Sequence, residues 1–273
     1  MIFEPPPYQV FCDGSKGQTA EKIILLCALV QTRQIFTDFT DDWRIALDAA
    51  PGIRYFHMRE ARIREGEFKG WKTIARDPKI ISLAEVILKH NLHAISCCIG
   101  SEDYNAILRP ASPSDLRDVF SLAFHVIIYT VAEYQLEVGL AGPADFIFDD
   151  EGEVGNEALL WYPAIKESAS PHMRAIMGTT PVFRSDEQVL PLQAADLVAW
   201  HKRRKKEVPG RDIETIATQR VDELPGCERH VPKEWLIDMA AKMAKAPNIE
   251  QFRDGPSIYK RLKHAFRTGK REV

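Results

Sequence analysis

Residues 8–13 read Tyr-Gln-Val-Phe-Cys-Asp, and residues 21–30 read Glu-Lys-Ile-Ile-Leu-Leu-Cys-Ala-Leu-Val. Both segments are apolar runs of the kind that forms β-strands, and Gly14 and Gly17 lie in the polar segment between them. We therefore expect the chain to begin with a β-hairpin, and we expect Asp13 to lie at the end of its first strand.

The segments after this hairpin predict the rest of the fold. A helical insertion is expected over about 36–90. The further elements expected are a strand at 93–100, a helix at 114–138 with Ser114 as its N-cap, a strand at 145–149, a helix at 155–169, a strand at 173–180 and a helix at 191–205. Three strands followed by alternating helices and strands is the element order of the ribonuclease H-like fold. The sequence therefore predicts an α/β protein with a mixed sheet of about five strands flanked by helices.

The division of the chain follows from the same order. Residues 1–208 are expected to form the ribonuclease H-like domain, with its helical insertion. Residues 209–273 are polar and are expected to form a helical appendage packed on that domain, with helices at 233–244 and 256–268.

Composition excludes several classes of protein. The 273 residues carry a net charge of −3, so the chain as a whole does not have the excess of basic residues of a bulk nucleic-acid binder. Four of the five cysteines lie in apolar runs and none forms a C-x-x-C pair, which predicts core thiols in a reducing compartment. We see no signal peptide and no apolar run near the ~20 residues of a membrane span. A cytoplasmic protein without a membrane partner is expected.

Carboxylates follow two of the expected strands and lie within one expected helix. Asp13 ends the first strand, Asp149 and Asp150 end the strand at 145–149, and Asp196 lies in the apolar helix at 191–205. Ligands of open α/β sheets bind beyond the carboxyl ends of the strands, where these acids are expected to meet. Converging carboxylates suit Mg²⁺ or Mn²⁺, which take oxygen ligands and often share them with phosphate.

Strand alternation separates the two neighbouring acids. Ile147 and Asp149 fall on one face of their strand, and Phe148 and Asp150 on the other. Only one of the two acids can share a face with the site unless the strand has ended. Alternation alone therefore leaves both Asp149 and Asp150 as candidates.

Asp196 gives the clearest signal within a helix. An ionised carboxylate among apolar neighbours is costly unless it is paired or bound to a metal. Pairing with Lys202 or Arg203 is the alternative to metal ligation. Gln193 lies one turn earlier on the same helix face and is a candidate for orienting substrate or a ligand.

His57 and Glu60 lie three residues apart before the third strand. On a helical turn they would face the same way, with Glu60 as a further metal ligand and His57 as a phosphate-binding or proton-shuttling group. Glu102 and Asp103, which follow the third strand, are the alternatives to Glu60. A surface loop without chemistry is an equally good interpretation of this segment.

Two basic runs are candidates for phosphate contacts. Lys202-Arg203-Arg204-Lys205-Lys206 begins six residues after Asp196, about 9 Å along a helix. The second run, Lys260-Arg261-Leu262-Lys263-His264, lies near the end of the chain. Such runs steer polyanions, although a solvated helix end that complements the helix dipole is the commoner interpretation.

Four blocks resemble the uncharacterised domain-of-unknown-function family 3800, which is assigned to the ribonuclease H-like group. The blocks are Phe11-Cys12-Asp13-Gly14-Ser15, Phe56-His57-Met58-Arg59-Glu60, Phe146-Ile147-Phe148-Asp149-Asp150-Glu151 and Leu192-Gln193-Ala194-Ala195-Asp196-Leu197-Val198-Ala199. The resemblance covers roughly residues 8–205. Its members usually carry Asp-Glu-Ser-Gly after the first strand, whereas this chain has Asp13-Gly14-Ser15-Lys16 and lacks the second acid.

The leading hypothesis is therefore a metal-dependent hydrolase of nucleic-acid phosphodiesters. Asp13, Asp149 and Asp196 would hold Mg²⁺ or Mn²⁺ with Glu60, while His57, Gln193, Lys202, Arg203 and Arg204 would contact substrate. The alternatives are a catalytically inactive nucleic-acid- or partner-binding protein, favoured by the missing acid, and a metal-dependent phosphatase of small substrates. The sequence leaves open RNA or DNA, strand state, cleavage position, biological role and oligomeric state.

Overall fold

The computed structural model contains a six-stranded mixed sheet in the order β5-β4-β1-β2-β3-β6. It describes residues 6–16, 23–112, 118–140, 142–150, 152, 155, 158–159, 162–207 and 218–244. The strands are β1 (Tyr8–Lys16), β2 (Ile23–Thr32), β3 (His93–Gly100), β4 (Ala144–Asp149), β5 (Val182–Arg184) and β6 (Glu228–Val231). Strand β2 runs antiparallel to both of its neighbours, and the other neighbouring pairs are parallel.

This architecture confirms the predicted α/β class and is consistent with a ribonuclease H-like fold. The hairpin of β1 and β2 is present, with Tyr8 opposite Thr32 and Lys16 opposite Ile24. The sheet has six strands instead of about five. The additional strand is β6, which pairs with β3 at the edge of the sheet.

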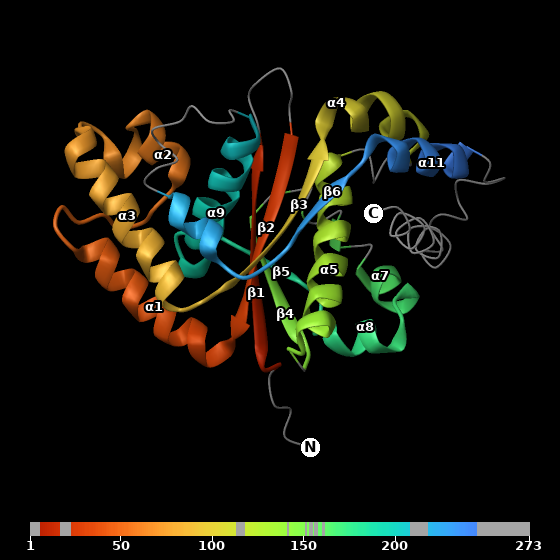
Figure 1. Ribbon diagram of the computed structural model, residues 1–273, viewed down its shortest axis with the longest axis horizontal. Helices are drawn as coiled ribbons and strands as arrows, with labels where there is room; N and C mark the ends of the chain where they lie inside the picture. The colour runs from red at the N-terminus through yellow and green to blue at the C-terminus, as the bar shows by residue number, and fades with distance from the viewer. Residues whose placement is uncertain are drawn as a thin grey trace.

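Helices cover both faces of the sheet (Figure 1). On one face lie α1 (Arg33–Asp48), α2 (Met58–Ile63), α3 (Thr73–Lys89) and α9 (Leu190–Glu207). On the other lie α5 (Val119–Val138), α7 (Tyr162–Ser168), α8 (Pro171–Ile176) and α11 (Lys233–Ala244). Shorter helical turns are η1 (Gly66–Phe68), α4 (Ser101–Asp103), η2 (Tyr104–Leu108), η3 (Arg109–Ala111) and η5 (Gln219–Glu223).

The sheet separates two apolar cores, because alternate residues of a strand point to opposite faces. Phe11 and Ile147 pack on the side of α9, whereas Cys12 and Phe148 pack on the side of α5. The burial of both strands on both faces explains the continuous apolar runs Val10-Phe11-Cys12 in β1 and Phe146-Ile147-Phe148 in β4. The four cysteines of β1, β2 and β3 are buried and free, as the sequence predicts.

Helix α5 is long and apolar enough, by length and composition, to cross a membrane, which the sequence analysis did not expect. Yet 83% of its most apolar window is buried inside the protein, where the helix covers the sheet. Helix α5 is therefore part of the core of this fold.

Two boundaries on this side differ from the predictions. Helix α5 begins at Val119, and Asp118 is its N-cap, with Oδ1 accepting the Phe120 N–H at 2.7 Å. Ser114, the expected cap, lies outside the described residues. The helix predicted at 155–169 is described as α7 over its last part.

The strand predicted at 173–180 is wrong. Residues 171–176 form α8, for which Ser170 is the N-cap and Pro171 the first residue. Proline fits there because the first turn of a helix needs no N–H donor from it. The adjacent strand is instead β5, which begins six residues later and pairs with β4 from Ile147 to Asp149.

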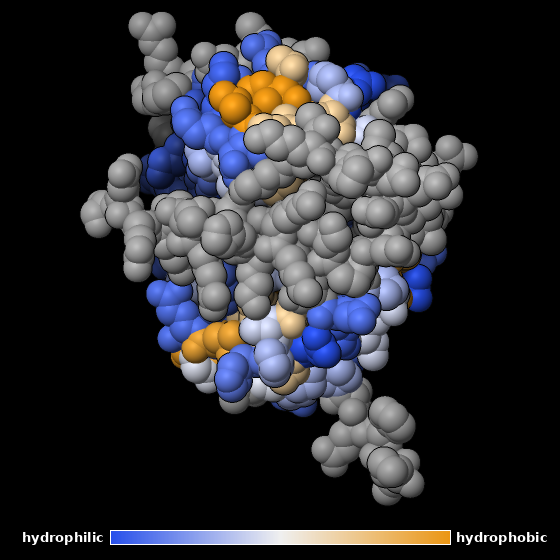
Figure 2. Space-filling model, turned by 90° about the vertical axis from the view of Figure 1, so that its right-hand side faces the viewer, coloured by the Kyte–Doolittle hydropathy of each residue, from blue (hydrophilic) through white to orange (hydrophobic). Residues whose placement is uncertain are grey.

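The remaining elements agree more closely. The insertion contains α1, α2 and α3, and α11 occupies the predicted range 233–244. The helix expected at 256–268, and the basic run Lys260–His264 within it, lie outside the described residues. Figure 2 shows the side of the molecule on which α11 lies; among the residues drawn in colour, hydrophilic ones surround separate hydrophobic groups.

His125 lies within α5 and is only 6% exposed. Burial lowers its pKa from 6.5 to about 3. The unfolded chain therefore takes up this proton near pH 6.5, and the folded protein does so only near pH 3. Stability is complete above pH 6.5 and is lost as the pH falls, by about 1.4 kcal/mol per pH unit.

We expect His125→Leu to remove this pH dependence. Between pH 6.5 and pH 5, the free energy of unfolding of the His125→Leu variant should fall by about 2 kcal/mol less than that of the wild type. Urea unfolding at several pH values measures this difference. The exposed His172 provides the control, since His172→Leu should follow the wild type. Equal slopes for His125→Leu and wild type would contradict the assignment.

Candidate functional site

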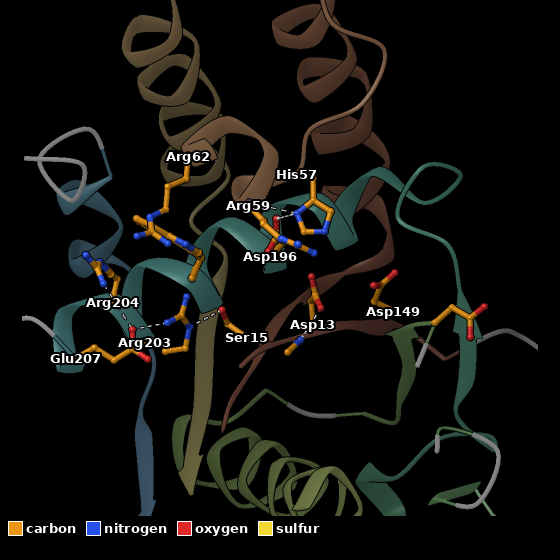
Figure 3. A pocket seen from close by; sticks show the side chains of 13 residues that line it. Asp13, Ser15, His57, Arg59, Arg62, Asp149, Asp196, Arg203, Arg204 and Glu207 are labelled. Carbon is orange, nitrogen blue, oxygen red and sulfur yellow. Dashed lines mark hydrogen bonds and ion pairs between the residues drawn. The ribbon is translucent and has the colours of Figure 1, made fainter. Parts of the chain in front are cut away.

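Asp13, Asp149 and Asp196 line one cavity of about 490 Å³ at the carboxyl ends of β1 and β4. In the parallel pair, Cys12 lies opposite Phe148, so the next residues, Asp13 and Asp149, follow neighbouring positions where this pairing ends. Strand β4 ends at Asp149, whereas β1 continues past Asp13 to Lys16, so the prediction that Asp13 ends its strand is wrong. Figure 3 shows the three carboxylates facing one space beside His57. The structure therefore brings together the three acids that the sequence singled out.

The pleat of the strands explains this convergence. Phe11 and Ile147 pack on the side of α9, so Asp13 and Asp149, two residues further along, point to the same face. Helix α9 presents Asp196 to that face from above the sheet. Asp150 also lines the cavity, because β4 ends at Asp149 and the strict alternation ends with it.

Asp196 is 5% exposed and is held by the segment that precedes α2. Its Oδ2 accepts the Met58 N–H at 2.6 Å and lies 3.2 Å from His57 Nδ1. The hydrogen bond to Asp196 raises the pKa of His57 to about 9, against the opposing effect of burial. His57 is therefore an imidazolium near neutral pH, and it pairs with a buried carboxylate.

The same His57 Nδ1 also lies 3.3 Å from the Arg59 N–H. An imidazolium has no acceptor nitrogen, so the two contacts cannot both be hydrogen bonds. The pair with Asp196 is charge-assisted and shorter, and we assign the proton to it. The Arg59 N–H is then the ordinary free donor of a first helical turn.

Gln193 does not line the cavity. It is fully buried, and its Oε1 accepts the Trp43 Nε1–H at 2.9 Å and the Phe56 N–H at 3.1 Å. Its Nε2 donates to the Asp186 carbonyl oxygen at 2.9 Å. The prediction that Gln193 contacts substrate is therefore wrong, because its amide is used inside the protein.

Glu60 is also directed away from the three acids. Its Oε1 accepts from the Tyr55 hydroxyl at 3.2 Å, and its Oε2 accepts the Glu67 N–H at 3.3 Å. It does not line the cavity, and its prediction as a fourth ligand fails on this geometry. His57 is the N-cap of α2, not a residue within it, so the expected shared face with Glu60 does not exist.

The alternatives to Glu60 are not in the cavity either. Glu102 and Asp103 belong to α4, after β3, and Asp103 Oδ1 pairs with Lys233 Nζ at 3.1 Å. Figure 1 places α4 near α11, on the opposite side of the sheet from α9.

Four arginines line the cavity together with the acids. Arg203 and Arg204 come from α9, as predicted, and Arg59 and Arg62 come from α2. Lys202 does not line it, because at about 100° per residue it lies outside the face of α9 that carries Asp196, Arg203 and Arg204. The predicted basic run thus contributes two of its five members.

Several lining residues were missed, although the sequence holds a signal for each. Arg59 and Arg62 lie three apart on one helix face. Ser15 follows Asp13 by two residues on one strand face, and Glu207 follows Arg203 by four residues on α9. Ser15 and Glu207 could have been found by continuing the period of β1 and α9 from Asp13 and Arg203, which were already selected.

Carboxylate oxygens from β1, β4 and α9 line one space, and such oxygens are the ligands that hard divalent cations bind. Among the residues described, however, no group of three His, Cys, Asp or Glu side chains is arranged to hold a metal ion. Asp13 Oδ1 accepts the Gly14 N–H at 2.5 Å, and Asp196 is paired with His57. Ion binding would require the carboxylates to turn toward one another.

Compared with known proteins, the chain matches no family model, and no curated protein and no solved structure matches it. The resemblance to family 3800 therefore stays a prediction. The functional argument depends on the geometry of the cavity.

Replacing Gln193 tests whether its amide stabilises the fold around the cavity. In Gln193→Leu the Trp43 Nε1–H and Phe56 N–H lose their acceptor while they stay buried. At about 1–3 kcal/mol for each, the free energy of unfolding should fall by roughly 2–6 kcal/mol. Urea denaturation measures this, with the exposed Gln188→Leu as the matched control. A loss equal to that of the control would contradict the role given to Gln193.

Proposed function

We propose that this protein binds nucleic acid at the cavity and hydrolyses its phosphodiester bonds with the aid of Mg²⁺ or Mn²⁺. The observation that carries the proposal is that Asp13, Asp149 and Asp196 line one cavity of about 490 Å³ together with four arginines. Phosphodiester hydrolysis needs both groups: oxygen ligands for a cation, and fixed positive charge for the phosphates.

Asp13, Asp149 and Asp196 are the residues that would hold the ion. A bound divalent cation supplies an activated water and neutralises developing charge on phosphate. Arg59, Arg62, Arg203 and Arg204 would neutralise the phosphates of the strand and orient it.

His57 carries a proton beside the acids, with 43% of its side chain exposed. In this proposal it passes that proton to the leaving oxygen, as a general acid does. Release of Asp196 from the imidazolium would also free the carboxylate for an ion. In this proposal His57 has two roles: it donates a proton to the leaving oxygen, and it pairs with Asp196 when no metal is bound.

A second candidate function is nucleic-acid binding without turnover. It is favoured by the contacts of Asp196 with His57 and Met58 and by the absence of a three-acid metal group among the described residues. The lack of a second acid after Asp13 points the same way. For either function we place the protein in the cytoplasm, since its buried free thiols suit a reducing compartment.

The test of turnover is cleavage of labelled RNA and DNA, single-stranded, duplex and hybrid, in Mn²⁺. We expect cleavage of at least one substrate, complete inhibition by EDTA, and a loss of roughly 100-fold or more in Asp13→Asn, Asp149→Asn and Asp196→Asn.

Asp145→Asn is the matched control for these variants. Asp145 lies on the same strand as Asp149 but outside the cavity, where it accepts hydrogen bonds from Thr179. Its activity should stay near that of the wild type. Cleavage that persists in Asp196→Asn, in a preparation free of contaminating nuclease, would refute the assignment. Inactivity with retained binding would establish the second candidate.

Metal binding can be tested without turnover. A ligand that binds only the folded state stabilises it by about 2.7 kcal/mol at a concentration of about 100 Kd. We expect Mn²⁺ to raise the melting temperature of the wild type by several degrees, and to raise that of Asp149→Asn less. Melting curves of the wild type that stay the same across a Mn²⁺ titration would remove the case for a metal site.

A further inference from the structure

Beyond the acids, the cavity contains a second set of polar groups along the same two elements. Ser15 follows Asp13 by two residues on β1, about 7 Å further at the usual strand rise. Arg203 follows Asp196 by seven residues on α9, about 10.5 Å further along the helix. Both pairs line the cavity, so it has an acidic part and an adjacent basic part.

The guanidinium of Arg203 is fixed in this basic part. Arg203 is only 7% exposed, and its Nε donates to Ser15 Oγ at 2.8 Å. Its Nη1 donates to Glu207 Oε2, whose side chain is 2% exposed (Figure 3). A surface arginine must lose side-chain entropy when it binds, whereas this one is already ordered by two partners.

Donors of Arg203 remain available to a ligand. Its Nη2 forms no hydrogen bond with the described residues, and it is not among the buried atoms that lack a partner. It is therefore reached from the cavity that Arg203 lines. Arg204 Nη1 lies 3.9 Å from the same Glu207 carboxylate, so two guanidinium groups face it. The donors of Arg203 that remain available are cationic N–H groups. An anion is the complementary ligand.

We propose that Ser15, Arg203 and Glu207 form a second phosphate subsite, in which Ser15 and Glu207 position the guanidinium and Arg203 binds the phosphate. This rests on the proposed function, in which the reacting phosphate lies at the acids. The separation of the two parts of the cavity is of the order of the spacing between successive phosphates of one strand. The substrate class is therefore a chain with at least two phosphates, not a small phosphate monoester.

The test uses a dinucleotide, whose single internal phosphate can occupy only one subsite. Three forms are compared: without a terminal phosphate, with a 5′-phosphate, and with a 3′-phosphate. Their affinities are measured by competition against a fluorescent oligonucleotide at low salt. We expect one of the phosphorylated forms to bind the wild type roughly tenfold more tightly than the unphosphorylated form, as for a hydrogen bond to a charged group.

Three variants separate positioning from charge. Ser15→Ala keeps the charge of Arg203 but removes the partner of its Nε. It should reduce the gain in affinity from the terminal phosphate to about twofold. Ser15→Thr retains the hydroxyl and should restore the full gain in affinity. Arg203→Lys keeps the charge without the fork of donors and should also lose most of the gain. Ser96→Ala, at a buried serine of β3 outside the cavity, is the matched control and should keep it.

The outcomes separate this inference from the proposed function. If oligonucleotides still bind, the second subsite is overturned by either of two results. One is an equal gain in affinity from the terminal phosphate in the wild type and in Ser15→Ala, and the other is no gain for any phosphorylated form. Failure of the wild type to bind any oligonucleotide would overturn both. A melting temperature for Ser15→Ala close to that of the wild type, together with a lost gain, would support a positioning role over a merely structural one.

Discussion

The side-chain amide of Gln193 connects the parts of the chain from which the cavity is built. It binds Trp43 of α1, the backbone of Phe56 and the carbonyl of Asp186, at distances of 2.9–3.1 Å. Phe56 directly precedes His57, and Asp186 lies in the connection between β5 and α9. One buried amide thus fixes α9 relative to the segment that carries His57. The contacts of Asp196 depend on this arrangement.

The charges of the cavity are arranged so that few of them lack a partner in the described structure. Asp196 is paired with His57, and Arg203 with Glu207. Such pairing lowers the cost of placing charges where they are shielded from water. It also means that a ligand must compete with internal partners. In the proposed function, the cation would replace the partner of the carboxylate, and the polyanion would replace the partner of the arginine. Neither component could replace both contacts alone.

The sequence predicted those features of the fold and site that depend on a short period. The alternation of β4 limited the choice to Asp149 or Asp150, the resemblance to family 3800 favoured Asp149, and the apolar environment of α9 identified Asp196. The strand predicted at 173–180 failed because Met173, Ile176 and Met177 have the i, i+3, i+4 spacing of a helix, and the start signal of that helix lay just before them, in Ser170 and Pro171. Glu60 failed because its direction depends on a tertiary contact with the Glu67 N–H, which no local pattern encodes.

The late strand β6 has a consequence for the integrity of the sheet. It has four residues, of which only Val231 is buried, so no apolar pattern marks it. Nevertheless its segment takes up the edge of β3: the Ala94 N–H donates to Pro225 O at 2.7 Å, and the Ser96 N–H donates to Cys227 O at 2.9 Å. A chain cut short before this segment would leave β3, apolar and rich in β-branched and sulfur-containing residues, with an open row of backbone donors and acceptors. Such an edge pairs with strands of other molecules. By covering β3, the segment that contains β6 therefore also protects the protein from self-association.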